Sequence, residues 1–109
     1  MTASRSSSDQ RKYTTEAALT RKVEEWLELQ PDIAFSKISD RFKRGISDLI
    51  LCVRGMFVAI ELKDDTGVVS EHQKQFIDNI IKRGGGIAAV CRTLEEVKTI
   101  VELARTRAR

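Results

Sequence analysis

Residues 46–63 read ISDLILCVRGMFVAIELK, two apolar runs separated only by Arg54 and Gly55. Runs this rich in Val, Ile and Leu favour β-strands. A glycine in so short a link is typical of a hairpin turn. The sequence therefore predicts an antiparallel hairpin, with strands over residues 46–53 and 56–63.

The flanking sequence predicts three helices and two shorter strands. The first helix begins near Thr15, and Ser70 and Thr93 begin the other two as the first residues of capping boxes. The pentapeptides AFSKI (34–38) and IAAVC (87–91) are typical of short strands. The resulting order, α-(β)-β-β-α-β-α, predicts an α/β (α+β) fold.

The composition is that of one folded domain. The chain has 109 residues, of which 41% are apolar and 32% are charged, so extensive disorder is excluded. Residues 1–13 are rich in Ser, Thr and Arg, and we expect a disordered basic segment there, followed by a single domain over residues 14–109. The formal net charge of +3 permits a polyanionic partner without requiring one.

We expect neither a membrane span nor export. The apolar runs are too short to cross a bilayer, and the N-terminus lacks the apolar core of a secretory signal. Cys52 and Cys91 lie inside apolar runs and outside any zinc-binding spacing. We therefore expect two buried thiols in a reducing cytoplasm.

Two charged residues end the second strand of the hairpin. Because strand side chains alternate between faces, Glu61 and Lys63 share one face, opposite Leu62. Charges on so apolar a strand need a partner, a metal ion or an opening to solvent. The plain alternative is an ion pair on a solvated outer face of the sheet.

Asp48 in the first strand is the candidate partner of Glu61. A tight turn at Arg54–Gly55 pairs residues of the two strands whose numbers sum to about 109. The turn fixes this register to within about one or two residues. Asp48 then faces Glu61, with Cβ atoms about 4.5–5.5 Å apart. Two carboxylates this close repel each other unless a cation lies between them, and their oxygens suit Mg²⁺ or Mn²⁺. Alternatively, Asp48 caps the end of its strand.

The helices add two polar groups that point toward the sheet. Glu16 lies on the flank of the apolar stripe of the first helix, although the helix dipole also favours an acid in the first turn. Gln73 lies within the stripe of the second helix, although a capping box explains it equally well. Together these groups suggest a metal held by Asp48 and Glu61 and assisted by Glu16, directly or through water. Lys63 would orient or deprotonate a water, or neutralise charge on a phosphate.

Positive charge gathers between residues 37 and 54, and we expect it to lie next to the proposed metal site. Binding of a phosphate backbone requires such a patch, so we expect these side chains to contact nucleic acid. The alternative is a solvated loop. The residues are Lys37, Arg41, Lys43, Arg44 and Arg54.

The spacing of the acidic residues resembles a known nuclease signature. Asp48, twelve intervening residues and then Glu-Leu-Lys are similar to the PD-(D/E)xK motif. GISDLIL (45–51) and GMFVAIELKDDTGVVSEHQKQF (55–76) resemble the VRR-NUC domain, in a likeness that spans residues 15–92. The resemblance implies a restriction-endonuclease-like core, with a mixed β-sheet flanked by helices, and cleavage of DNA with Mg²⁺ or Mn²⁺.

The resemblance also implies roles for single residues. The implied metal ligands are two carboxylates and one backbone carbonyl. The other implied roles are a catalytic lysine, an acid on the first helix and a glutamine of the family motif. In that order, these residues are Asp48, Glu61, Leu62, Lys63, Glu16 and Gln73. In one departure from the family pattern, Ser47 stands where proline is usual, at a position that shapes the backbone without supplying a ligand.

Stand-alone members of the family are similar to Holliday-junction resolvases, which act as homodimers on branched DNA, and such small nucleases are typical of phages. The resemblance therefore implies a metal-dependent endonuclease, selective for four-way junctions or other branched DNA. We expect a homodimer in the cytoplasm of a bacterium or of a phage-infected host, with no membrane partner and no small-molecule cofactor. The alternative is a non-catalytic nucleic-acid-binding or scaffold module, and the residues separate DNA from RNA poorly.

Overall fold

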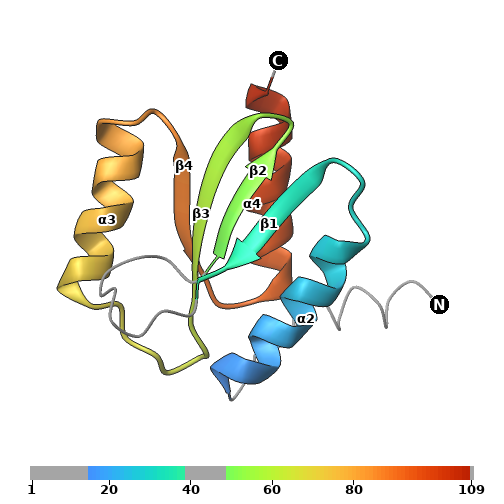
Figure 1. Cartoon of the computed structure of the whole chain (residues 1–109). Helices are drawn as coiled ribbons and strands as arrows, with labels where there is room; N and C mark the ends of the chain where they lie inside the picture. The colour runs from blue at the N-terminus through green and yellow to red at the C-terminus, as the bar shows by residue number, and fades with distance from the viewer. Residues whose placement is uncertain (1–14, 39–48, 109) are drawn as a thin grey trace.

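The computed structural model describes residues 15–38 and 49–108 (Figure 1). Within these residues three helices surround a four-stranded mixed sheet, which confirms the predicted α/β (α+β) fold and its element order. The expected basic segment over residues 1–13 lies outside the described residues. No helix in this part of the chain is long and apolar enough to cross a membrane. The elements are α2 (Glu16–Glu28), β1 (Ile33–Lys37), β2 (Leu49–Val53), β3 (Met56–Leu62), α3 (Glu71–Lys82), β4 (Ile87–Cys91) and α4 (Leu94–Arg107).

The hairpin of β2 and β3 has the predicted turn and register. Arg54 and Gly55 both adopt left-handed backbone conformations, with φ of 52° and 88°. Such two-residue turns are favoured because their twist matches that of the strands they join. Leu49 pairs with Ile60, so the register in which the paired numbers sum to 109 is confirmed.

The strand order is β1-β2-β3-β4, with β4 parallel to β3 and the other pairs antiparallel. A parallel pair needs a crossover connection, and α3 supplies it. Helices α2 and α4 pack on one face of the sheet, and α3 packs against β3 and β4 from the other (Figure 1). Strand β3 is therefore enclosed by strands on both edges and by helices on both faces.

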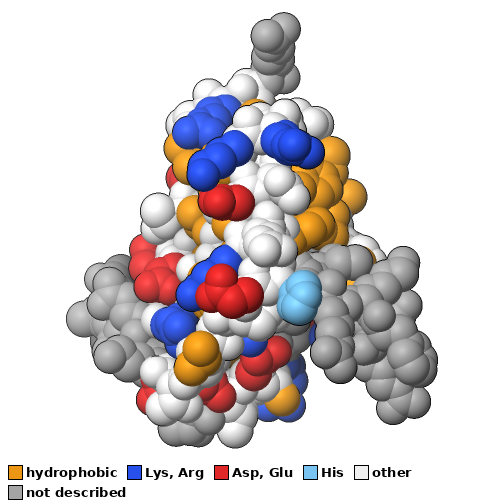
Figure 2. Space-filling model, turned by 90° about the vertical axis from the view of Figure 1, so that its left-hand side faces the viewer, with side chains coloured by type: hydrophobic (Ala, Val, Ile, Leu, Met, Phe, Trp, Pro, Cys, Tyr) orange, Lys and Arg blue, Asp and Glu red, His pale blue; other side chains and the backbone are white. Residues whose placement is uncertain are grey.

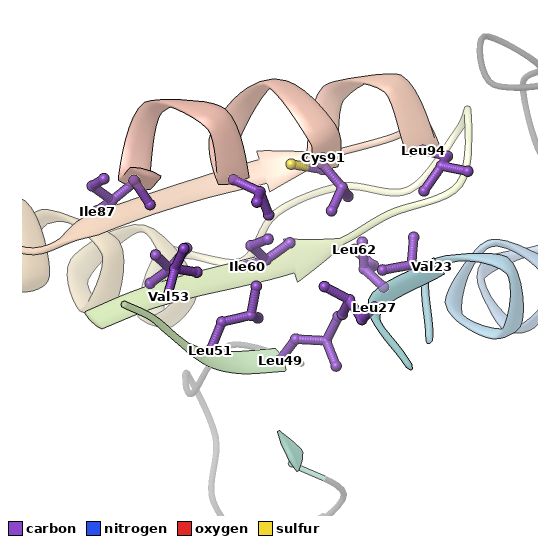
Figure 3. Packing of buried hydrophobic residues seen from close by; sticks show 14 of the residues in the cluster. Val23, Leu27, Leu49, Leu51, Val53, Ile60, Leu62, Ile87, Cys91 and Leu94 are labelled. Carbon is purple, nitrogen blue, oxygen red and sulfur yellow. The ribbon is translucent and has the colours of Figure 1, made fainter. Parts of the chain in front are cut away.

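The hydrophobic core lies between the sheet and helices α2 and α4 (Figure 3). Alternate residues of the strands point into it, and the apolar stripes of the two helices cover them. Burial of one large aliphatic side chain stabilises a fold by about 1.5–3 kcal/mol. The buried residues include Leu19, Val23, Leu27, Leu49, Leu51, Val53, Ile60, Leu62, Cys91 and Val101.

The prediction of two buried cysteines is wrong for one of them. Cys91 is buried, and burial raises the pKa of its thiol to about 12. Cys52 is exposed, because Leu51 and Val53 take the core-facing positions of β2 and the residue between them points to the other face. An apolar run alone did not distinguish the two faces of the strand.

Candidate functional site

A carboxylate is buried near the carboxyl end of β3. Glu61 is only 1% exposed, in a strand whose residues 58–62 are all buried. A buried carboxylate requires hydrogen bonds and a counter-charge. Gln73 supplies a hydrogen bond, since its Nε2 donates to Glu61 Oε2 across 2.7 Å. Lys63 supplies the charge, with its Nζ 3.4 Å from the same oxygen.

Glu61 and Lys63 lie on one face of the strand, as the alternation of side chains predicts. Lys63 directly follows β3, and its backbone N–H still donates to the Cys91 carbonyl of β4 at 3.1 Å. The lysine side chain is 15% exposed, so the pair is not a solvated surface ion pair. A sheltered lysine side chain that is still partly exposed can meet a ligand arriving from outside.

Gln73 fills two roles at once. Ser70 starts α3 with a capping box: Gln73 Oε1 accepts from the Ser70 backbone N–H at 3.0 Å, and Ser70 Oγ accepts from the Gln73 backbone N–H at 3.2 Å. The amide oxygen is thereby engaged at the start of the helix, and the amide nitrogen faces Glu61. The start of α3 thus fixes the orientation of a side chain that contacts the buried carboxylate.

The rest of α3 presents a solvated surface. Figure 2 shows this side of the molecule, where acidic and basic side chains intermingle. Lys74 pairs with Glu71 at 3.2 Å and Lys82 pairs with Asp78 at 3.3 Å, with all four side chains exposed. Surface pairs of this kind contribute about 0–1 kcal/mol. The helix therefore contributes to the site chiefly through Gln73.

The remaining predicted acids are Glu16 and Asp48. Glu16 is the exposed first residue of α2, whose first turn lies toward the end of the molecule at which β3 finishes (Figure 1). Asp48 lies outside the described residues, so its expected pairing with Glu61 stays a prediction. Within residues 15–38 and 49–108, no group of three His, Cys, Asp or Glu side chains could hold a metal ion. A metal site at Glu61 therefore stays a prediction.

The basic residues are divided between the two ends of the sheet. Lys37 is exposed at the end of β1 and pairs with the first residue of β2, so it lies at the same end as Glu61. Arg54 lies in the hairpin turn, where its Nε donates to Asp32 Oδ2 at 2.8 Å. The expectation that Arg54 lies beside the site is wrong, because the turn and the carboxyl end of β3 are opposite ends of one strand. Outside the described residues lie Arg41, Lys43 and Arg44.

An arginine that no sequence motif singled out also lies at the Glu61 end of the sheet. Arg92 directly follows β4, and its Nη1 donates to the backbone carbonyl of Asp64 at 2.7 Å. Because β4 runs parallel to β3, Arg92 stands beside Lys63 at the same end of the sheet. The pKa of Asp64 is lowered, first by the hydrogen bond from the Thr66 backbone N–H and also by the charge of Arg92. Only the parallel pairing, which no local sequence pattern indicates, brings these residues together.

Solved structures share this fold. One, described as "VRR_NUC domain", is 24% identical with a TM-score of 0.67, over 83% of this chain and 97% of the other. A second, described as "VRR_NUC domain protein", is 22% identical with a TM-score of 0.68, over 90% of this chain and 93% of the other. At these identities the likeness establishes the fold.

Sequence comparison identifies the family. No curated protein sequence matches the chain. The model of the VRR-NUC domain matches residues 3–94, which is most of the sequence. This match includes both strands of the hairpin and the whole of α3. The chain therefore belongs to the VRR-NUC domain family and has its nuclease-type fold.

Proposed function

We propose that this chain is a Mg²⁺- or Mn²⁺-dependent endonuclease that hydrolyses phosphodiester bonds of DNA. The observation that carries the proposal is the buried carboxylate of Glu61, bound by Gln73 and Lys63 at the end of β3. A buried ion pair is often no more stabilising than apolar residues of the same volume. Three polar groups at this place in a nuclease-type fold therefore favour a chemical role over a structural one.

The proposed metal site consists of hard oxygen donors, which suit Mg²⁺ and Mn²⁺. The ligands would be the Asp48 and Glu61 carboxylates and the Leu62 backbone carbonyl, with Glu16 binding directly or through water. The donor chemistry fits, because Gln73 already orients the Glu61 carboxylate and the sequence predicts that Asp48 faces it. The bound metal would neutralise charge on the phosphate and lower the pKa of a bound water.

Lys63 is the proposed catalytic lysine. Its Nζ, 3.4 Å from Glu61 Oε2, lies where it can orient a water for attack on phosphorus or neutralise charge on a phosphate oxygen. Gln73 acts through Glu61, since its amide donates to the carboxylate and fixes the orientation of that group.

The proposed substrate is branched DNA, such as a four-way junction, bound by a homodimer. Lys37 is exposed at the Glu61 end of the sheet, where a contact to phosphate would bring a DNA backbone toward Lys63. Phosphate contacts carry no sequence information, so selectivity would come from the shape of the DNA. Similarity to stand-alone family members supports the junction and the dimer. The proposed surface also includes Arg41, Lys43 and Arg44.

The test is a cleavage assay on a labelled four-way junction, a matched linear duplex and single-stranded DNA. Each substrate is incubated with Mg²⁺, Mn²⁺ or EDTA, and Asp48→Asn is the control variant. Metal-dependent cutting of the junction that is lost in the variant supports the whole proposal. Equal cutting of all substrates keeps the nuclease and rejects junction selectivity. Binding without cutting in either metal rejects the enzyme and favours the non-catalytic binding or scaffold module.

A further inference from the structure

The chain folds back on itself directly after Lys63. Asp64 Oδ1 accepts hydrogen bonds from the backbone N–H and the hydroxyl of Thr66, at 3.0 and 3.2 Å. The Asp64 carbonyl accepts from the Gly67 backbone N–H at 3.4 Å. These bonds close residues 64–67 into a compact turn, here called the Lys63 turn.

Gly67 lies against the side chain of Lys63. A Cβ added at position 67 would stand 3.1 Å from Lys63 Cδ, 3.4 Å from Lys63 Cβ and 3.3 Å from Asp64 Oδ1. The absence of a side chain at Gly67 therefore lets the backbone of the Lys63 turn rest on the aliphatic stem of the lysine. The turn confines that stem on one side, and the ammonium beyond it lies 3.4 Å from Glu61 Oε2.

Arg92 holds the Lys63 turn in place. Its Nη1 donates to the Asp64 carbonyl at 2.7 Å, so this oxygen accepts from Arg92 as well as from within the turn. The backbone of Arg92 is itself anchored, because its N–H donates to Glu96 Oε1 at 2.6 Å in the first turn of α4. The Lys63 turn is thus attached to the end of β4 and, through Arg92, to the start of α4.

We propose that Arg92 and Gly67 are positioning residues that hold the Lys63 side chain in one conformation. The consequence for catalysis rests on the nuclease function proposed above. A lysine has a flexible four-carbon stem, and an unrestrained ammonium samples many positions. Gly67 lets the turn contact the stem, and Arg92 keeps the turn where that contact persists, so the ammonium stays beside Glu61.

Gly67→Ala is the sharpest test. The backbone at Gly67 has no positive φ, so alanine can adopt it, and the nearest atoms to the new methyl group belong to Lys63 and Asp64. We expect the rate of cleavage of the four-way junction to fall roughly 10- to 100-fold, because small displacements of catalytic groups reduce rates by such factors. The melting temperature should stay close to the wild-type value.

Side-chain order is measured separately, by NMR of protein labelled with ¹⁵N-lysine. The Lys63 ammonium should give a restrained signal in the wild type and a more mobile one in Gly67→Ala. The exposed ammonium of Lys74 is the internal reference, and it should be mobile in both proteins.

Arg92→Ala and Arg92→Lys form the second pair of variants. Arg92→Ala should make the Lys63 ammonium more mobile and lower kcat with little change in KM. Arg92→Lys retains a hydrogen-bond donor, so it should restore part of the Lys63 order and part of kcat. Arg107→Ala is the matched control, since Arg107 is an exposed arginine in the last turn of α4, at the far end of the molecule. It should leave Lys63 order and cleavage unchanged.

The outcomes separate this proposal from the nuclease proposal. An unchanged Lys63 signal in both Gly67→Ala and Arg92→Ala overturns the positioning role, whether or not the protein cuts DNA. A rise in KM with unchanged kcat in Arg92→Ala also overturns it, because that result indicates a substrate contact. Loosening of Lys63 in both variants of a protein that cuts no DNA supports the positioning role and rejects the nuclease.

Discussion

The two ends of β3 carry two clusters of charged groups with different properties. At the turn end, the carboxylate of Asp32 lies between two arginines and is 20% exposed. At the other end, the carboxylate of Glu61 lies against a lysine and a glutamine and is 1% exposed. The first cluster joins separate elements at the surface, whereas the second lies inside the sheet.

The turn-end cluster stabilises the fold. Arg105 of α4 binds Asp32 through Nε and Nη2, at 2.9 and 2.8 Å, and Arg54 donates to the same carboxylate at 2.8 Å. Two-pronged contacts between arginine and carboxylate are among the strongest hydrogen bonds in proteins. These bonds, that of Arg105 foremost, lower the pKa of Asp32 to about 2. The cluster ties the α2–β1 connection, the hairpin turn and α4 together.

The contact between Lys63 and Glu61 is longer, at 3.4 Å, although Glu61 is far more buried. A buried ion pair offsets its desolvation only when its geometry is close to ideal. The ion pairs of the Asp32 carboxylate at the surface are therefore tighter than the ion pair of the buried Glu61 carboxylate with Lys63. A looser contact suits the catalytic role proposed for this ammonium.

The largest expected effect comes from removing the charge of Lys63. Lys63→Met keeps an apolar stem and should lower kcat for DNA cleavage by roughly 10²–10⁴-fold, the range for loss of a group that assists proton transfer. The counterpart at the turn end, Arg105→Met, should lower the melting temperature and leave kcat unchanged. Circular dichroism checks that both variants fold. Cleavage by Lys63→Met at the wild-type rate would show that the two ends do not differ in function.

A smaller effect is expected from Gln73→Glu. Glutamate preserves the capping box but places a second carboxylate against Glu61. At pH 7 we expect a loss of stability of about 1–3 kcal/mol, because the donor to a buried acceptor is replaced by a like charge. A lower pH weakens the repulsion between the two carboxylates, so the loss of stability should shrink as the pH falls. Thermal melts of variant and wild type in EDTA, from about pH 5 to pH 8, measure this, and a constant difference in melting temperature would contradict it.

Asp32→Asn tests the opposite end through pH. The pKa of Asp32 is about 2 in the folded state, against an ordinary value of 3.8. The ionised carboxylate therefore stabilises the folded state fully at a pH above about 4. This stabilisation is lost as the pH falls from about 4 to about 2. The melting temperature of Asp32→Asn should therefore be lower than that of the wild type at neutral pH, and the two should converge near pH 2. DNA cleavage by the variant should equal that of the wild type.

The smallest effect separates the two basic residues at the ends of the sheet. Lys37→Ala should weaken binding of junction DNA and reduce the slope of log affinity against log salt by about 1. Arg54→Ala should change neither, because Arg54 lies at the far end and is bound to Asp32. Fluorescence anisotropy at several salt concentrations measures both slopes. Equal losses of DNA affinity in the two variants would indicate that the DNA-binding surface runs along the whole sheet.

Local patterns predicted the features that local chemistry controls. A two-residue turn restricts the register of the strands that it joins, so the pairing of Leu49 with Ile60 followed from the sequence. The capping box of Ser70 and Gln73 followed for the same reason. Four of the predicted residues, Glu61, Leu62, Lys63 and Gln73, come from these two local features.

Contacts between distant segments were not predictable in this way. Arg105 and Asp32 are 73 positions apart, and Arg92 and Asp64 are 28 apart. Each contact depends on how α4 or β4 docks on the sheet, which no periodicity encodes. Arg54 was misplaced because closeness in sequence was taken for closeness in space. It lies in the turn between β2 and β3, whereas Glu61 lies near the opposite end of β3.

Helix α3 has no fully buried residue, whereas α2 and α4 each bury several. Elements with few buried apolar contacts open first, in local unfolding that leaves the rest of the fold intact. Because Gln73 belongs to α3, such an opening removes the amide donor from Glu61 while the core around α2 and α4 stays folded. On gentle heating, the amide protons of α3 should therefore exchange with deuterium before those of α4. The proposed nuclease activity should disappear at a lower temperature than the one at which the core around α2 and α4 unfolds.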